Sequence, residues 1–230
     1  INGDGFDDVI IGAAALGTLR NAYNIAGGAG DGPNNERHNA GEVYVVFGRP
    51  DLPRDIDLNA NPPQDLLVVY GADGGENSPD RLGEEIVTAD INGDGLADML
   101  LGAYRADGPG NSRPDAGDVC VVYGARDLPG RVIDLVDPPE GTMLIYGARD
   151  QAIAGDAIAA GDIHGDGYDD LFIGVPGDDG PLDRPFSGGI VVIAGGPNLP
   201  AVVDLAAPSV PVVWIQAPDN FDFSAYWAAA

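Results

Sequence analysis

The stretch DINGDGLAD, residues 90–98, places an oxygen-bearing side chain at every second position and then leads into an apolar run. The donors that it offers are Asp90, Asn92, Asp94 and Asp98. Two similar strings occur, INGDGFDD at residues 1–8 and DIHGDGYDD at residues 162–170. Each is followed by an apolar run that contains a glycine, so the acidic string belongs to a repeating unit.

The repeating unit predicts short β-strands separated by turns. After each acidic string come DVIIGAA, DMLLGAY or DLFIGVP, then GEVYVVFG, GDVCVVYG or GGIVVIAG, and then DLLVVYGA, GTMLIYGA or VVWIQAP. These runs are rich in β-branched and aromatic residues, and a sustained helical period is absent. We therefore expect an all-β fold of propeller-type blades, each with four antiparallel strands. A β-solenoid is the alternative, but its repeats are usually shorter.

The spacing of the acidic strings sets the repeat boundaries. We expect a first repeat at residues 1–80 with a Gly/Asn-rich insertion at residues 16–41, a second at 81–151 and a third at 152–222, with residues 223–230 as the first strand of a fourth. Closed propellers have about four to eight blades. Three repeats therefore predict part of a larger propeller, or chains that join end to end as a homo-oligomer or filament.

The acidic string has the composition of a calcium-binding loop. Ca²⁺ prefers six to eight oxygen ligands, which side chains at positions 1, 3, 5 and 9 and a backbone carbonyl at position 7 can supply. Crowded carboxylates repel one another, and a divalent cation reverses that repulsion. The predicted ligands of the second loop are Asp90, Asn92, Asp94, the carbonyl of Leu96, and Asp98.

The other two loops deviate from this ligand set. The third offers Asp162, Asp166, the carbonyl of Tyr168, and Asp170, with His164 at position 3. Imidazole is a poor ligand for Ca²⁺, so His164 is expected to face solvent or to reach the ion through water, with direct ligation as the alternative. The first loop offers Asn2, Asp4, the carbonyl of Phe6, and Asp8, and it lacks position 1.

Two other interpretations of the loops were weighed. An EF-hand needs a bidentate Glu at position 12, but that position holds the apolar Leu101 or Ile173. A metal-free Asp/Asn/Gly turn is the second alternative, and three copies in phase disfavour it.

The segments IVTADINGDGLADMLLGAY and AIAAGDIHGDGYDDLFIGVP resemble FG-GAP repeats, which form the blades of the integrin α-subunit propeller and occur in many bacterial extracellular proteins. The resemblance extends over the chain in three copies. It implies a propeller with calcium in loops between strands, usually with seven blades.

Composition narrows the function. The 230-residue chain has a formal net charge of −26, which makes nucleic acid an unfavourable partner. Only six of its 37 acidic residues are Glu, and this preference for the shorter Asp favours cation-holding loops. No apolar run reaches about 18 residues, so no membrane-spanning segment is expected. The one cysteine, Cys120, is expected to be buried, and Trp214 and Trp227 to pack in the core or between blades.

These observations favour a non-catalytic, calcium-binding module, extracellular or on the cell surface, with a protein or glycan partner. Loop sites of this type suit the millimolar Ca²⁺ found outside cells. No Ser or Cys nucleophile is spaced around His38 in a way that suggests a catalytic triad, so no catalytic residue is assigned. The alternative is an accessory propeller domain of a secreted hydrolase or phospholipase, which a neighbouring catalytic domain in the same gene would indicate.

Overall fold

The computed structural model describes residues 1–14, 30–58, 65–75 and 79–226, and this part of the chain is almost entirely β-structure. Its strands are β1 (Val9–Ala13), β2 (Glu42–Val46), β3 (Leu66–Tyr70), β4 (Ile86–Ala89), β5 (Asp98–Ala103), β6 (Asp118–Val122), β7 (Val132–Asp134), β8 (Thr142–Tyr146), β9 (Ile158–Gly161), β10 (Asp170–Gly174), β11 (Gly189–Ile193), β12 (Val202–Asp204) and β13 (Val212–Gln216). Two 3-10 turns, η1 (Pro33–Asn35) and η2 (Pro109–Asn111), lie between strands.

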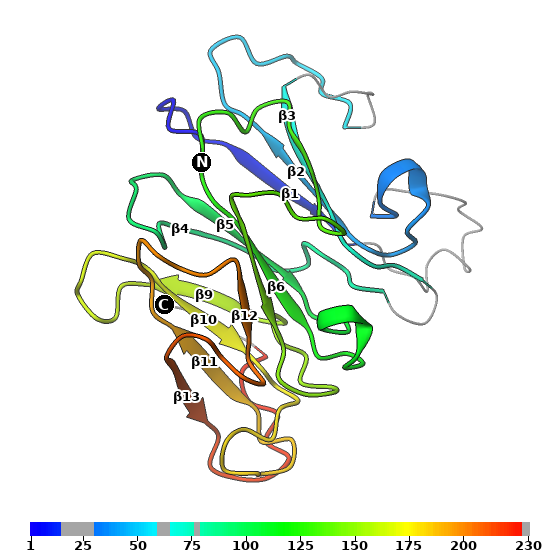
Figure 1. Ribbon diagram of the computed structural model, residues 1–230. Coiled ribbons are helices and arrows are strands. Elements are labelled where there is room, and N and C mark those ends of the chain that lie inside the picture. The colour runs from blue at the N-terminus through cyan, green and yellow to red at the C-terminus, as the bar shows by residue number, and fades with distance from the viewer. Residues whose placement is uncertain (15–29, 59–64, 76–78, 227–230) are drawn as a thin grey trace.

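The strands form three sheets that lie next to one another as propeller-type blades (Figure 1). The first sheet has the order β1-β2-β3-β7, the second β12-β8-β6-β5-β4, and the third β13-β11-β10-β9. Consecutive strands within a repeat pair antiparallel, as in Leu101↔Cys120 between β5 and β6. The expectation of an all-β fold with blade-like sheets is therefore confirmed.

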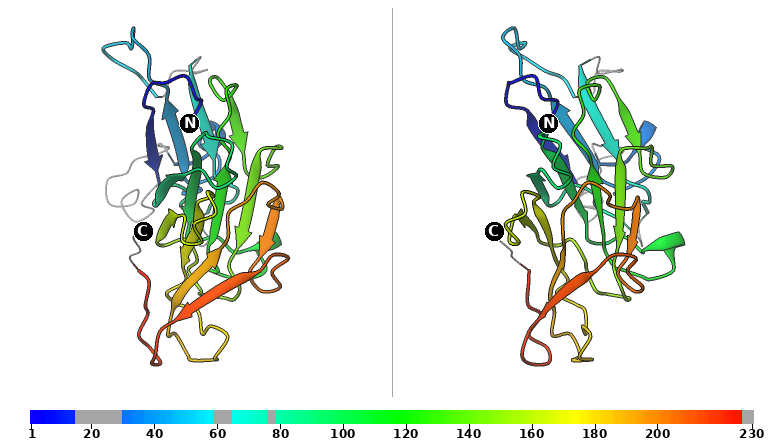
Figure 2. Two further views of the ribbon diagram at one scale, coloured as in Figure 1. Left: turned by 90° about the vertical axis from the view of Figure 1, so that its left-hand side faces the viewer. Right: turned by 60° about the vertical axis from the view of Figure 1, so that its left-hand side comes forward.

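The outermost strand of two sheets comes from the following repeat. β7 pairs in parallel with β3, with Val69 opposite Ile133, and β12 pairs in parallel with β8, with Ile145 opposite Val203. Figure 2 shows the orange β12 beside β8 of the middle sheet and separate from the sheet of its own repeat. The sequence boundaries assign β7 and β12 to the second and third repeats, so each repeat also completes its predecessor's sheet.

Apolar residues on both faces of the second sheet are buried because a sheet lies on each side. Met99 and Leu101 of β5 pack in a cluster with residues of the first sheet, including Val45. Leu100, between them in the sequence, packs with residues of the third sheet, including Leu171. This two-sided burial explains why the strands contain continuous apolar runs and do not alternate with polar residues.

Part of the predicted insertion lies within the described structure. Residues 30–41 form the turn η1 and its flanking loops, whereas residues 15–29 lie outside the described residues. The predicted strand at residues 223–230 is described only to residue 226, and here Ser224 forms an isolated parallel bridge with Gly188.

The strand that follows each acidic loop contains one glycine, which allows neighbouring repeats to approach closely. These glycines are Gly12 in β1, Gly102 in β5 and Gly174 in β10. A Cβ on Gly102 would lie 2.3 Å from the carbonyl oxygen of Gly155, and one on Gly12 would lie 2.0 Å from that of Gly83. Backbone hydrogen bonds cross the boundary between the first two repeats, as from the Leu82 N–H to the Ala40 carbonyl at 2.9 Å. The glycine in IIGA, LLGA and FIGV is therefore a packing requirement between repeats.

We predict that Gly102→Ala lowers the free energy of unfolding by about 2–3 kcal/mol, because the sheets must separate to accommodate the methyl group. Denaturant unfolding measures this change. Gly75→Ala is the matched control, since a Cβ on Gly75 would meet no atom within 4 Å. Equal losses in the two variants would contradict the packing role.

Candidate metal centre

The three acidic loops lie in a row along one side of the molecule, at the left in Figure 1. A Cβ on Gly3 of the first loop would lie 2.5 Å from the Leu96 side chain, and one on Gly93 of the second would lie 2.3 Å from the Tyr168 ring. The residue at position 7 of one loop thus packs against the glycine at position 4 of the loop before it. The backbone N–H of Asp90 also donates to the Asp169 carboxylate at 3.0 Å, so the second and third loops are directly linked.

The second loop is folded around its first carboxylate. Asp90 accepts hydrogen bonds from the backbone N–H groups of Gly93, Asp94 and Gly95 at 2.8–3.1 Å. Asn92 accepts from the N–H of Asp94 at 2.8 Å, and the Asp94 carboxylate accepts from the N–H of Leu96 at 2.8 Å. These Asx-type bonds explain why short Asp and Asn side chains occur at alternate positions, even before any cation is considered.

The carboxylate at position 9 is buried and connects two segments. Asp98 is fully buried and accepts from the N–H of Ile91 at 3.0 Å and from the N–H of Gly124 at 2.8 Å. Burial raises the pKa of Asp98 to about 6, and the nearby Asp94 and Asp90 add to that rise, while the two N–H donors oppose it. A cation near this group would lower its pKa again.

The same connection is present in the other two repeats. Asp170 is fully buried and accepts from the N–H groups of Ile163 and Gly195, each at 3.0 Å. Asp8 accepts from the N–H of Gly48 at 3.0 Å and from the amino terminus of Ile1 at 2.8 Å. Sequence analysis assigned these aspartates as ligands and missed the glycines, although the recurring glycine in VVFG, VVYG and VIAG was a visible signal.

The third loop differs at its histidine. Asp162 accepts from the N–H groups of Gly165, Asp166 and Gly167, and Asp166 accepts from the N–H of Tyr168 at 3.1 Å, as in the second loop. His164 instead turns its Nδ1 to the Asp170 carboxylate, 2.8 Å away, and remains partly exposed. The imidazole therefore faces a predicted ligand of its own loop.

The first loop retains the central part of the same framework. Asn2 donates to Asp4 at 2.9 Å, and Asp4 accepts from the N–H of Phe6 at 2.9 Å. This N–H bond lowers the pKa of the Asp4 carboxyl.

The side-chain donors of the three acidic loops are Asp, Asn and His residues. Within the described ranges, no three His, Cys, Asp or Glu side chains are placed to hold a metal ion. Their chemistry nevertheless fits a hard cation, since every donor apart from His164 is an oxygen. A carboxylate has about four lone-pair sites. Asp94 accepts from Leu96 and Asn92 among the described residues, so it retains capacity for an ion.

A second acidic region, which sequence analysis did not identify, lies between the first two sheets. A cavity of about 390 Å³ is lined by Asp73, Asp80, Asp107, Asp118, Cys120 and Tyr146, among others. Burial raises the pKa of Asp80 to about 8, and it raises the pKa of Asp118 well above the ordinary value. Asp80 and Asp118 are far apart in the sequence, so only the packing of the sheets brings them to the same cavity.

We predict that Asp80→Asn increases the free energy of unfolding more at pH 9 than at pH 5, with a difference of about 2 kcal/mol or more. The raised pKa means that the folded state binds the proton more tightly, so the wild-type contribution of Asp80 falls as the pH rises from about 4 to about 8. Asn cannot ionise and keeps an oxygen that can accept from the N–H of Asp73. Urea unfolding at the two pH values tests this, and an equal gain at both would contradict it.

The sequence also predicts the positions of Cys120 and of the two tryptophans, Trp214 and Trp227. Cys120 is buried as predicted, and its pKa is raised to about 12 by burial. Trp214 is half-buried and packs against the cluster between the second and third sheets, whereas Trp227 lies outside the described residues. No described helix has both the length and the apolar character needed to cross a membrane.

Residues 82–122 match the family model of the FG-GAP repeat. This stretch contains the second loop and the strands β4, β5 and β6. This match agrees with the resemblance to FG-GAP repeats seen in the sequence, for residues 82–122.

The chain is also similar to phosphatidylinositol-glycan-specific phospholipase D. The protein from Homo sapiens is 36% identical over 99 residues, and those from Bos taurus and Mus musculus are 36% and 37% identical over 96 and 99 residues. Each match covers 42% of this chain and 11% of the relative. The similarity thus concerns about a tenth of the relatives' length.

Proposed function

We propose that this chain is a non-catalytic, calcium-stabilised interaction module that acts outside the cell or at its surface. The observation that carries the proposal is the row of three loops, in which oxygen donors recur at alternate positions except at His164 and the aspartate side chain at position 9 is buried. Their carboxylates raise the electrostatic energy of the folded chain, and divalent cations would offset this. The FG-GAP match supports the same class of module.

The donors proposed for the second loop are Asp90, Asn92, Asp94 and the Leu96 carbonyl, with Asp98 either as a ligand or as the support of the loop. Asn92 and Asp94 are at least partly exposed and can turn toward an ion, whereas the buried Asp98 is held by two N–H groups. The third loop offers Asp162, Asp166, the Tyr168 carbonyl and Asp170. The first offers Asn2, Asp4, the Phe6 carbonyl and Asp8.

We expect Ca²⁺ to raise the melting temperature relative to EGTA, because ligand binding to the folded state stabilises by about 2.7 kcal/mol per site at a hundredfold excess over Kd. Asp94→Ala should remove about one bound ion per chain, as counted by calorimetry. The control is Asp127→Ala, an exposed aspartate outside the loops. Identical melting curves with Ca²⁺ and with EGTA would refute the proposal.

We further expect His164→Asn to strengthen calcium binding by the third loop. Asn would supply an oxygen at position 3, as Asn92 does, and would release Asp170 from its contact with the imidazole. Calorimetric titration should resolve one site with a lower Kd. Unchanged or weaker binding would indicate that position 3 does not face the ion.

A second candidate function is an accessory propeller domain of a secreted enzyme. The 36% identity to part of phosphatidylinositol-glycan-specific phospholipase D favours it. The module would then position a catalytic domain or its substrate without taking part in the reaction. Sequencing the complete gene discriminates the two, because a catalytic domain encoded beside these repeats would favour the accessory role.

A further inference from the structure

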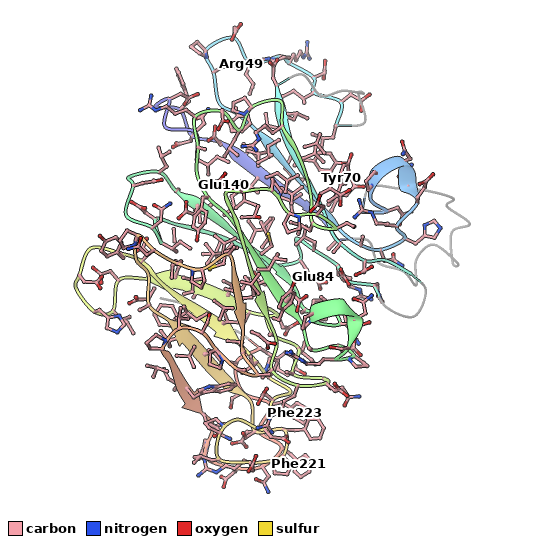
Figure 3. The ribbon with its side chains drawn as sticks, viewed as in Figure 1. Arg49, Tyr70, Glu84, Glu140, Phe221 and Phe223 are labelled. Atoms are coloured by element: carbon pink, nitrogen blue, oxygen red, sulfur yellow. The ribbon has the colours of Figure 1, made fainter. Side chains whose placement is uncertain are left out.

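The cavity between the first two sheets combines an acidic and an aliphatic lining. Its volume of about 390 Å³ lies within the range of small-molecule pockets, about 300–1,000 Å³. Several of its lining residues come from the chain between Tyr70 and Glu84, which Figure 3 labels. No Lys, Arg or His is among its described lining residues. The carboxylates of the lining belong to Asp73, Asp80, Asp107 and Asp118.

Asp118 has a carboxylate oxygen with an unmet hydrogen bond. Asp80 accepts from the N–H of Asp73 at 2.8 Å, and Asp107 accepts from the N–H of Asp115 at 2.8 Å. The Oδ1 atom of Asp118 is buried and has no hydrogen-bond partner among the described residues. A buried acceptor without a donor costs free energy. Asp118 is only partly buried as a residue and lines the cavity, so a donor that enters the cavity can reach its carboxylate.

The first repeat shows which group is missing beside Asp118. The strand β2 (EVYVV) aligns with β6 (DVCVV), so Glu42 has the position of Asp118 and Tyr44 that of Cys120. Glu42 is buried, and its carboxylate accepts a hydrogen bond from the Tyr44 hydroxyl. Cys120 has neither the ring nor the hydroxyl, and it lines the cavity. The smaller side chain therefore leaves space at this position and removes the donor that a tyrosine would supply.

The acidic residues of the cavity are not required by the repeat itself. In the third repeat, β11 begins with a glycine at the position of Asp118. Asp80 lies three residues before Gly83, and the position three residues before the equivalent Gly155 holds Ala152. Burial of carboxylates without a full set of partners is unfavourable. A local feature that costs stability and that the fold can omit is typical of a functional site.

The chemistry of the cavity favours an organic cation over a metal ion. Ca²⁺ needs six to eight oxygen ligands, but within the described ranges no three acidic side chains are placed to hold a metal. The neighbouring arginines already have partners, because Arg37 pairs with Asp134 and Arg113 pairs with Asp204. Carbon-rich side chains line much of the remaining surface and suit an alkyl group. They include Leu82, Ala103, Ala106, Leu135 and Leu144.

We propose that this cavity binds a small aliphatic ammonium ion. Its N–H groups donate to the carboxylates of Asp118 and Asp80, and its alkyl part packs against aliphatic side chains such as Leu82 and Leu135. The ammonium group takes the role that the Tyr44 hydroxyl has beside Glu42. The site is independent of calcium binding, because none of these residues belongs to the acidic loops.

Calorimetric titration with n-butylammonium chloride tests the site, at constant ionic strength and with EGTA present. We expect one saturable site in the wild-type chain and much weaker binding of the neutral 1-butanol. Asp118→Asn should weaken the binding of butylammonium by about tenfold or more, because it removes the buried charge. Asp127→Asn is the matched control, since it removes one negative charge from an exposed position.

Three outcomes of this titration would overturn the proposal. They are the absence of saturable binding to the wild-type chain, equal affinity for 1-butanol, and equal weakening by Asp118→Asn and Asp127→Asn. Equal weakening would mean that the ion responds only to the overall negative charge.

Filling the cavity provides a second test that leaves the charge unchanged. Cys120→Tyr introduces the side chain found at the equivalent position of β2, so it should occupy the space, donate to Asp118 and abolish butylammonium binding. Cys120→Val is the matched control, because β11 has valine at this position and the cavity stays open. Circular dichroism verifies folding. A folded Cys120→Tyr variant that binds as tightly as Cys120→Val would contradict the proposal, and if it fails to fold, the comparison of Asp118→Asn with Asp127→Asn decides.

Discussion

The arrangement of each repeat depends on one buried carboxylate at the ninth position of the acidic loop. Asp98 holds the N–H of Ile91 at the start of its loop and the N–H of Gly124 after the neighbouring strand. A buried charge is unfavourable unless it is well hydrogen-bonded, so these two contacts must form together. They bring the loop, β5 and the end of β6 into one register, and Asp8 and Asp170 do the same in the other repeats.

From this starting point the repeats stack by close backbone approach and two-sided burial. The strand after each acidic loop contains a glycine because a Cβ at this position would collide with the next repeat. A Cβ on Gly102, for example, would collide with the carbonyl oxygen of Gly155. The middle sheet then has apolar clusters on both faces. The short strands β7 and β12 extend this coupling, because each leaves its own repeat and completes the preceding sheet. Arg37 pairs with Asp134 of β7, and Arg113 pairs with Asp204 of β12. Nearest-neighbour contacts of this kind are how repeat proteins accumulate stability.

The acidic side chains serve two distinct purposes in this architecture. Those at positions 1 and 5 of the second loop, together with the amide of Asn92 at position 3, order the loop through backbone N–H groups and retain lone pairs for a cation. The aspartates of the cavity between the first two sheets, such as Asp80, are instead desolvated without a full set of donors, which raises their pKa. The same residue type is therefore stabilising in the loops and unfavourable when ionised between the sheets.

The sequence by itself determined the fold class, the repeat and the positions of the loops, because acidic strings and apolar runs recur with local spacing. The second repeat is the clearest case, and residues 82–122 match the FG-GAP family model. Local spacing could not show that β7 and β12 leave their repeats, that Gly48, Gly124 and Gly195 donate to the buried aspartates, or that Asp80 and Asp118 share a cavity. Those features join residues far apart in the chain, and only tertiary packing determines which distant partners meet.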